Sequence, residues 1–171
     1  MPDATGLELI RQELGDSVLD STYFRDRATL VIDPASVRSV LAQLRASGYS
    51  FMASLHGLDY YPQEPRLGVI YELLDMTRVD RISVELRVPS TDAVVASVTP
   101  DTPQGAGWPA ANHQEREVYD MFGVRFSDHP DLRRILMPED YQGHPQRRDF
   151  PLGGEPVAFT YNESEQVGSR G

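Results

Sequence analysis

The sequence predicts an α+β fold: a two-layer domain with helices on a mixed β-sheet, followed by an extended Pro-rich C-terminal segment. Two observations support this prediction. Up to residue 98, apolar periodicity runs in the order helix, two strands, helix and three strands. From residue 123 onward, prolines recur too often for a long helix or a sheet interior. We therefore expect an α+β domain at 1–98, a loop and a helix at 99–122, and an extended segment with a mobile tail at 123–171.

The first helix is predicted at 7–14, where leucine and isoleucine recur at helical spacing ahead of a glycine. Two short strands are predicted within 17–32, with a hairpin turn at Arg25 and Asp26. The clearest amphipathic helix is predicted within 35–48. Its valines and leucines form one stripe, which begins after an Asp-Pro pair and ends at a glycine.

Three further strands are predicted at 49–60, 67–76 and 81–89. In the last of them Ile, Val and Leu alternate with Arg, Ser and Glu, which predicts that one face of this strand is exposed to water. Residues 99–109 are rich in proline and glycine and predict a loop. The helix predicted at 110–122 follows a proline directly.

The composition excludes several classes of chemistry. The 171 residues are 40% hydrophobic and 25% charged, which is normal for one globular domain. Cysteine is absent, which excludes disulfides, a thiolate nucleophile, Cys-based zinc sites and the usual ligands of iron–sulfur clusters. Lysine is absent too, which excludes Schiff-base and P-loop chemistry.

Charge and hydropathy restrict the partners and the location. The formal net charge of −10 argues against a general nucleic-acid binder. The longest apolar runs are far shorter than the roughly 20 residues that cross a bilayer as a helix. The N-terminal sequence lacks the basic and apolar regions of a secretory signal. We expect a soluble intracellular chain, at most peripheral to a membrane.

A triplet of charges, Glu115-Arg116-Glu117, precedes the apolar part of the helix predicted at 110–122. Its two glutamates point about 200° apart on a helix, so they cannot converge as a glycosidase pair. His113 and Glu117 share a helix face, but one histidine makes only half of a zinc-protease motif. Neither a nucleophile elbow nor a nucleotide-binding loop is present. The sequence therefore predicts no catalytic, cofactor-binding or metal-ligating residue.

Two interpretations of the charged residues remain open. In the first, the triplet is a solvated helix end with local ion pairs, such as Arg116 with Asp120 at i, i+4. In the second, the helix packs on its own domain and is covered by a partner, so at least one charge is buried and paired. The pairs Arg133-Arg134 and Arg147-Arg148 are likewise solvated or anchored on a partner's acids. In an acidic, lysine-free chain we favour anchoring.

Two stretches decide between these interpretations. The sequences "EREVYDMFGVRFSDHPDLRRIL" (115–136) and "GHPQRRDFPL" (143–152) closely resemble the 30-kDa subunit family of respiratory complex I, also called its C subunit. "GLDY" (57–60) and "YELL" (71–74) also resemble the family's pattern. The resemblance covers roughly residues 30–157. The sequence departs from the family pattern at His113, at Gln146 and in the loop 99–108.

The resemblance implies a non-catalytic structural and assembly subunit of the quinone-reducing module, in the peripheral arm of a proton-pumping NADH:quinone oxidoreductase. Such a subunit lies beside the hydrogenase-large-subunit-like subunit and neighbouring Fe-S subunits. It sits on the cytoplasmic side of the cell membrane and touches the membrane only through the complex. It holds no cofactor, whereas FMN and Fe-S clusters belong to partner subunits. The alternatives are the equivalent subunit of a related complex, such as a membrane-bound hydrogenase or a ferredoxin- or deazaflavin-fed complex, or a free-standing α+β binding module.

By the same resemblance, the helix within 99–122 is an interface helix and 123–171 includes a partner-binding segment. The triplet would lock this helix between its own domain and a partner. The predicted interface residues are the charged residues and histidines of both parts: Glu115, Arg116, Glu117, Asp120, His129, Asp131, Arg133, Arg134, His144, Arg147, Arg148 and Asp149.

Overall fold

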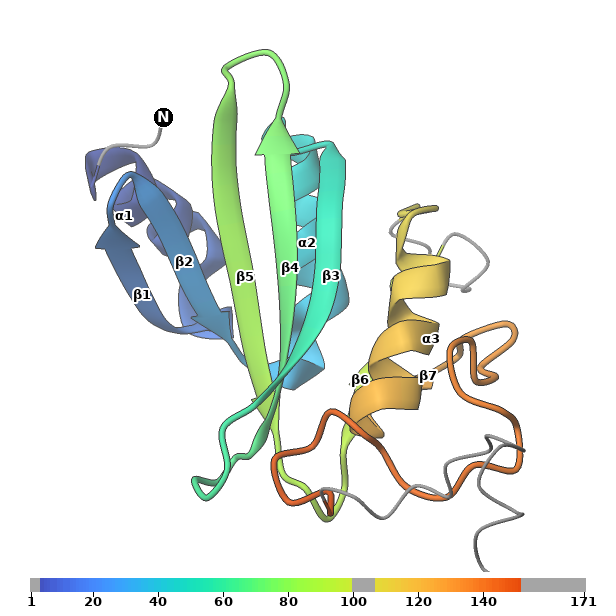
Figure 1. Cartoon of the computed structure of the whole chain (residues 1–171). Coiled ribbons are helices and arrows are strands. Elements are labelled where there is room, and N and C mark those ends of the chain that lie inside the picture. Colours follow the sequence, from blue (N-terminus) through green and yellow to red (C-terminus); the bar gives the residue numbers. More distant parts are fainter. Residues whose placement is uncertain (1–3, 100–106, 152–171) are drawn as a thin grey trace, which may run out of the picture.

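Five strands form the main sheet in the order β1-β2-β5-β4-β3 (Figure 1). The computed structural model describes residues 4–99 and 107–151. The strands are β1 Val18–Phe24, β2 Arg27–Ile32, β3 Phe51–Asp59, β4 Leu67–Asp75 and β5 Asp80–Val88. Neighbouring strands are antiparallel except β2 and β5, which are parallel. The mixed sheet confirms the predicted α+β fold class.

Helices α1 (Ala4–Leu14) and α2 (Val37–Ala46) cover one face of this sheet (Figure 1). Short 3-10 turns at Gly15–Ser17 and Pro34–Ser36 connect each helix to a strand. Asp33 caps the second turn by accepting a hydrogen bond from Ala35 N at 3.1 Å, as expected of an Asp-Pro start.

The core lies between these two helices and the sheet. Alternate residues of each inner strand point into it because successive side chains in a strand face opposite sides. The side chains with no exposed surface include Leu30, Ile32, Val37, Leu41, Leu67, Val69, Tyr71, Leu73, Ile82, Val84 and Leu86. Each aliphatic side chain of this set contributes about 1.5–3 kcal/mol by leaving water.

The prediction that one face of β5 is exposed to water is only partly correct. Arg81 is exposed, but Ser83 and Glu85 are 6% and 9% exposed. Glu85 accepts hydrogen bonds from the Tyr60 hydroxyl at 2.8 Å and from Arg87 Nε at 2.7 Å. The prediction failed at these positions because polar side chains of neighbouring residues cover the outer face.

The third helix, α3 (Ala111–Phe122), lies beside the edge strand β3 (Figure 1). Gln114 accepts a hydrogen bond from Leu55 N on that strand. A Cβ at Gly57 would overlap the ring of Phe122, so glycine at 57 permits the close approach of helix and strand. Packing of α3 on this strand covers an edge that would otherwise be open to pairing.

Most element boundaries agree with the sequence prediction, and two short strands were missed. The turn at Arg25 and Asp26 is confirmed, with φ of 50° and 60°. The missed strands are β6 (Val94–Ala96) and β7 (Arg125–Ser127), which pair in parallel. This ladder connects the domain predicted at 1–98 to the segment predicted from 123. The predicted mobile tail, 160–171, and most of the predicted loop lie outside the described residues.

None of the helices in the described ranges is both long and apolar enough to cross a membrane.

Candidate functional site

The three charges of the triplet have three different environments on α3. Glu115 has no exposed surface, Arg116 is half-buried and Glu117 is exposed. Successive helical residues point about 100° apart, so only one of the three can face the domain. Glu115 takes that place.

Glu115 joins α3 to the chain that follows β6. Its carboxylate accepts hydrogen bonds from Ser97 Oγ at 2.6 Å and from Val98 N at 2.7 Å. Burial raises the pKa of Glu115 to about 7, although both hydrogen bonds act against this increase. The carboxyl group can therefore hold a proton near neutral pH. Because none of its surface is exposed, we assign it a structural role in this structure.

His129 lies near the same carboxylate. Its Nε2 is 3.8 Å from Glu115 Oε2 and 3.2 Å from the carbonyl oxygen of Asn112. Its Nδ1 accepts a hydrogen bond from Asp131 N at 3.0 Å, which places the ring proton on Nε2 in the neutral form. Burial lowers the pKa of His129 and favours this neutral form.

Asp120 is the main attachment point for the segment after β7. Its side chain is fully buried and accepts a hydrogen bond from Arg134 Nη1 at 2.6 Å. It also accepts backbone N–H bonds from the three consecutive residues 135–137, at 2.8–3.0 Å. Burial alone would raise the pKa of Asp120, but these four donors outweigh it and lower the pKa below its usual value.

The predicted pairing of Arg116 with Asp120 is wrong. Arg116 instead donates to the carbonyl oxygens of Arg133 at 3.1 Å and Arg134 at 3.3 Å. The three N–H groups and the Arg134 guanidinium all converge on the carboxylate of Asp120. Arg116 therefore binds carbonyl groups of the same segment. A spacing argument along the helix cannot detect this competition from a distant segment.

The end of α3 is closed by residues further along the chain. His144 Nδ1 lies 2.9 Å from the carbonyl oxygen of Asp120, and Arg147 Nε donates to that of Phe122 at 2.6 Å. The last carbonyl groups of a helix have no partner within the helix, so these two side chains satisfy them. Gly123, with φ of 75°, ends the helix in the left-handed conformation.

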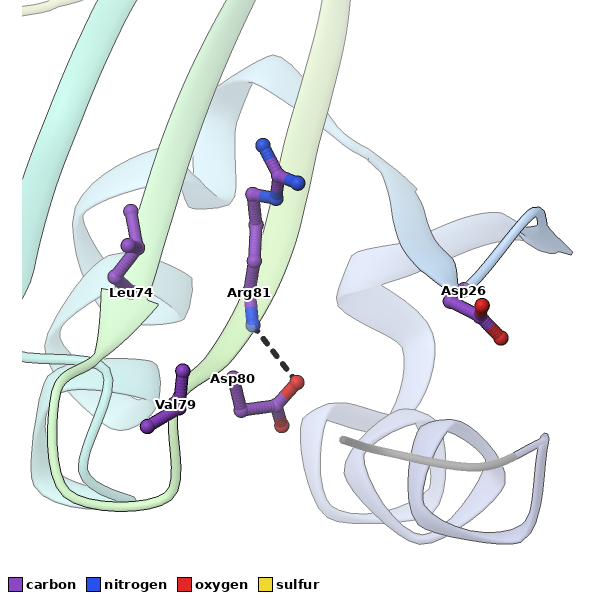
Figure 2. Close-up of a pocket in the computed structure, with 5 residues that line it drawn as sticks. All are labelled: Asp26, Leu74, Val79, Asp80 and Arg81. Carbon is purple, nitrogen blue, oxygen red and sulfur yellow. Dashed lines mark hydrogen bonds between the residues drawn. The ribbon is translucent and has the colours of Figure 1, made fainter.

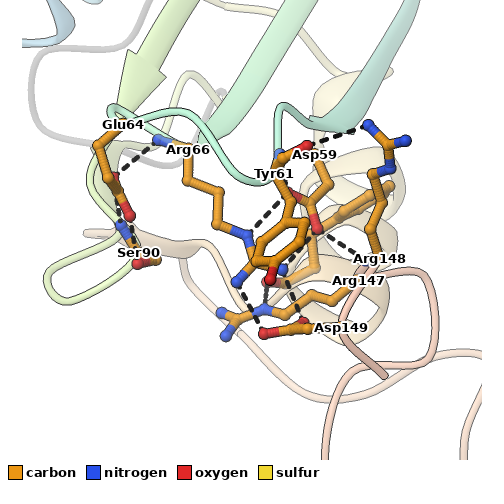
Figure 3. A network of polar contacts seen from close by, with 9 residues as sticks. Asp59, Tyr61, Glu64, Arg66, Ser90, Arg147, Arg148 and Asp149 are labelled. Atoms are coloured by element: carbon orange, nitrogen blue, oxygen red, sulfur yellow. Dashed lines mark hydrogen bonds and ion pairs between the residues drawn. The ribbon is translucent and has the colours of Figure 1, made fainter. Parts of the chain in front are cut away.

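A second attachment point lies at the loop between β3 and β4 (Figure 3). Arg66, 7% exposed, pairs with Asp59 through two hydrogen bonds of 2.7 and 2.8 Å. It pairs in the same way with Asp149, at 2.6 and 2.7 Å. Hydrogen bonds from Arg66 hold the pKa of Asp59 well below its usual range. Arg148 N adds a third contact, at 2.7 Å from Asp59 Oδ2.

Sequence reasoning singled out Asp149 and Glu115 but missed their partners: Arg66, which joins Asp149 to Asp59, and Ser97, which binds Glu115. The only sequence signal near this attachment point was the "GLDY" stretch at 57–60, which contains Asp59 but neither Arg66 nor Ser97. Arg66 is 83 residues away from Asp149, so no local pattern connects them.

The remaining predicted site residues are exposed. Arg133 and Asp131 pair with each other at 2.6 Å, with side chains 64% and 46% exposed. Arg148 donates from Nη1 to the carbonyl oxygen of Tyr61 at 3.1 Å. Whether these residues contact partner subunits stays a prediction.

Two cavities lie away from all twelve predicted residues. One, of about 370 Å³, is lined by Asp26, Leu74, Val79, Asp80 and Arg81 at the hairpin ends of the sheet (Figure 2). The other, of about 340 Å³, is lined by Leu19, Asp20, Val31, Ile32, Pro34, Pro65 and Arg87. Within the described ranges, no three His, Asp or Glu side chains come together as metal ligands.

Comparison with known proteins identifies the family. Residues 30–156 match the family model of the respiratory-chain NADH dehydrogenase 30 Kd subunit. The C subunit of NADH-quinone oxidoreductase from Roseiflexus sp. (strain RS-1) is 42% identical over 166 residues, which are 95% of this chain and 92% of that protein. The protein of the same name from Citrifermentans bemidjiense is 37% identical over 146 residues, or 85% of this chain and 87% of that protein.

Solved structures agree with this match. The trypsin-resistant fragment of Nqo5 superposes with a TM-score of 0.62 at 30% identity, over 77% of this chain and 100% of that chain. A chain of the membrane-bound sulfane sulfur reductase, an archaeal respiratory membrane complex, superposes with a TM-score of 0.71 at 22% identity. The superposition covers 98% of this chain and 95% of that chain. The second likeness concerns the fold alone. Together with the sequence matches, these findings show that the chain belongs to the 30-kDa subunit family of complex I, the C subunits of NADH-quinone oxidoreductase.

Proposed function

We propose that this chain is a structural and assembly subunit of the quinone-reducing module in the peripheral arm of complex I. As a member of its family, the chain is a non-catalytic peripheral subunit of NADH-quinone oxidoreductase. The observation that carries the proposal is the 42% identity to a relative in this family over 95% of this chain. In this proposal electrons pass from NADH through FMN and Fe-S centres of partner subunits to quinone, and this chain holds no cofactor.

The geometry supports a structural role for the buried charges. Glu115 and Asp120 bind backbone and side-chain groups of their own chain, and neither has exposed surface. Their hydrogen bonds attach α3 to the end of β6 and to the segment after β7. In the proposed role, these residues set the shape of the surface that partners meet.

The outward-facing members of the predicted set are the proposed contacts. They include Glu117, Arg133, Arg148 and Asp149. Ile135 and Leu136, in the same segment, are 37% and 59% exposed, so apolar surface lies next to these charges. Apolar side chains surrounded by arginines are typical of protein–protein interfaces. The proposed partners are the hydrogenase-large-subunit-like subunit and neighbouring Fe-S subunits, on the cytoplasmic side of the membrane, which the chain touches only through the complex.

Native purification through a tag on this chain, from gently solubilised membranes, tests the proposal. We expect the chain to elute in a large assembly with flavin and iron–sulfur absorbance and with NADH oxidation that is coupled to quinone reduction. An untagged strain is the control for adventitious capture. A chain that elutes alone, even after crosslinking in cells, would refute the proposal. An assembly that reduces quinone from another donor, without oxidising NADH, would indicate the equivalent subunit of a related complex.

A further inference from the structure

Arg147 differs from the other arginines of the C-terminal segment. Arg133 and Arg134 each pair with an aspartate at 2.6 Å, and Arg148 is exposed to water. Arg147 is half-buried, and no acid within the described ranges lies at ion-pair distance from it. A guanidinium group that is partly removed from water is costly unless an anion compensates it.

The carboxylates nearest to Arg147 are already engaged. Asp59 and Asp149 attract it electrostatically, but both bind the guanidinium of Arg66 through paired hydrogen bonds of 2.6–2.8 Å. Figure 3 shows Arg147 beside this network. Burial lowers the pKa of Arg147, and the like charge of Arg66 lowers it further. The local surroundings therefore leave this guanidinium without its own anion.

Arg147 is held in position by its own chain. Its backbone N donates to His144 O at 3.1 Å, and its carbonyl oxygen accepts from Phe150 N at 3.0 Å. Its Nε donates to Phe122 O, which fixes the plane of the guanidinium. Nη1 and Nη2 have no acceptor among the described residues. A pre-organised pair of donors fits the two oxygens of a carboxylate and loses little entropy on binding.

We propose that Arg147 receives a carboxylate side chain, Asp or Glu, from a neighbouring subunit of the complex; this inference rests on the function proposed above. Tyr61 lies beside this position and is 46% exposed, with its ring 4.9 Å from the Arg66 guanidinium (Figure 3). Exposed tyrosine next to arginine is typical of the centre of an interface. Arg147, Tyr61 and the partner's acid form the proposed contact.

The first test measures how much tagged full-length chain stays in the complex. Arg147→Gln should reduce the retained fraction at least about tenfold, because truncation of a buried charged hydrogen bond strongly affects binding. Arg147→Lys keeps the charge but not the planar fork, and should retain an intermediate fraction. Arg81→Gln, at the opposite end of the sheet, is the matched control and should be retained like the unaltered chain. Unchanged retention of Arg147→Gln would refute the inference while the proposed function stands.

A second measurement separates a contact to a partner from an internal contact. In the full chain expressed alone, Arg147→Gln loses only the bond to Phe122 O and should lower the thermal midpoint clearly less than Arg134→Gln, which takes the cation away from the buried Asp120 carboxylate. An equal loss in both variants would overturn the inference, because Arg147 would then be internally paired. Glu155→Gln tests the next acid along the sequence after the described residues, and a loss of retention equal to that of Arg147→Gln would also overturn it.

The last step identifies the partner's acid. A photo-crosslinking residue at position 147 should attach to a peptide of a neighbouring subunit that contains Asp or Glu. Arg147→Glu should then abolish retention, and exchange of that acid for arginine should restore it. A structural defect would not be rescued by this charge exchange. Failure of the exchange to rescue retention would count against a direct pair.

Discussion

The sheet domain and the C-terminal segment of this chain are stabilised by different interactions. In the domain, side chains of α2, β2, β4 and β5 lie with no exposed surface between layers that are held by continuous backbone ladders. In the segment 128–151, the described residues form neither helix nor strand. Leu132 and Met137 pack against the core, and a few charged hydrogen bonds attach the segment to Asp120, Arg66 and the end of α3. One region distributes its stability over many contacts, and the other concentrates it in a few.

This difference determines how each region responds to a change. Apolar burial is spread over many side chains, so one exposed polar substitution has little effect on the domain. A desolvated carboxylate with four donors leaves all four unsatisfied when it is removed. We therefore expect single polar substitutions to detach the segment while the sheet remains folded.

The largest effect is expected for Asp120→Ala. It leaves three backbone N–H groups and Arg134 without the buried carboxylate that they bind and should lower the free energy of unfolding by about 3–5 kcal/mol. Hydrogen exchange should accelerate in 134–151 before it does in the sheet. Asp131→Ala, which removes an exposed acid of the same segment, is the control. Uniform acceleration across both regions would show that they unfold together.

The next effect depends on pH. The pKa of Glu115 in the folded protein is about 7, above the usual glutamate value of 4.5. Complete ionisation of this carboxyl group therefore lowers the free energy of unfolding by about 3 kcal/mol. This destabilisation is absent below pH 4.5; stability is lost as the pH rises toward 7 and levels off above it. Glu115→Gln should remove this dependence and be more stable than the unaltered chain at pH 8.

Denaturant titrations at several pH values measure this effect. The lowered pKa of His129 and of His144 acts in the opposite sense, because stability is lost as the pH falls below the usual histidine value of 6.5. The difference between the Gln variant and the unaltered chain cancels these contributions. An equal pH dependence in both proteins would contradict a raised pKa at position 115.

Arg66→Gln should lower the free energy of unfolding by about 2 kcal/mol, an intermediate effect. It removes four hydrogen bonds to Asp59 and Asp149, but Asp59 keeps the backbone donors of Tyr61 and Arg148. Trypsin should cut at Arg147 and Arg148 sooner than in the unaltered chain. If cutting at Arg133 accelerates equally, the two attachment points are not independent.

Gly123→Ala should lower the free energy of unfolding by about 1–2 kcal/mol. Its φ of 75° is unfavourable for alanine, and the new Cβ would lie 2.5 Å from His144 Nε2 and 2.6 Å from Arg147 Nη2. A denaturant titration measures the change. Gly15→Ala is a matched control, since Gly15 has φ of 58° but no atom within 4 Å of the position that a Cβ would take. Equal losses would mean that the left-handed conformation alone accounts for the effect.

The smallest effect is expected for Arg133→Gln. Arg133 pairs with Asp131 where both are exposed, and such pairs contribute little in water. The full chain alone should show an unchanged thermal midpoint, and only retention in the complex should fall. A large loss in the isolated chain would show that this arginine, too, stabilises the segment internally.

Sequence reasoning was most accurate where short-range patterns decide structure. The stripe of α2, the turn at Arg25 and Asp26, and the end of α3 at Gly123 follow from side-chain periodicity and backbone preference within a few residues. The strands β6 and β7 were missed because each has three residues, too few for a periodic signal. Ser83 and Glu85 were expected to be exposed because alternation describes one strand and ignores what its neighbours cover.

The sequence by itself determined the order of the main helices and strands, the break in character after residue 98 and, through its motifs, the family. Only the tertiary structure decided which charges meet: Asp120 binds Arg134 instead of Arg116, and Asp149 binds Arg66 across 83 residues. The physical reason is range. Backbone preferences and apolar periodicity act over a few residues, whereas a buried charge binds whichever donors the fold brings within about 3 Å of it.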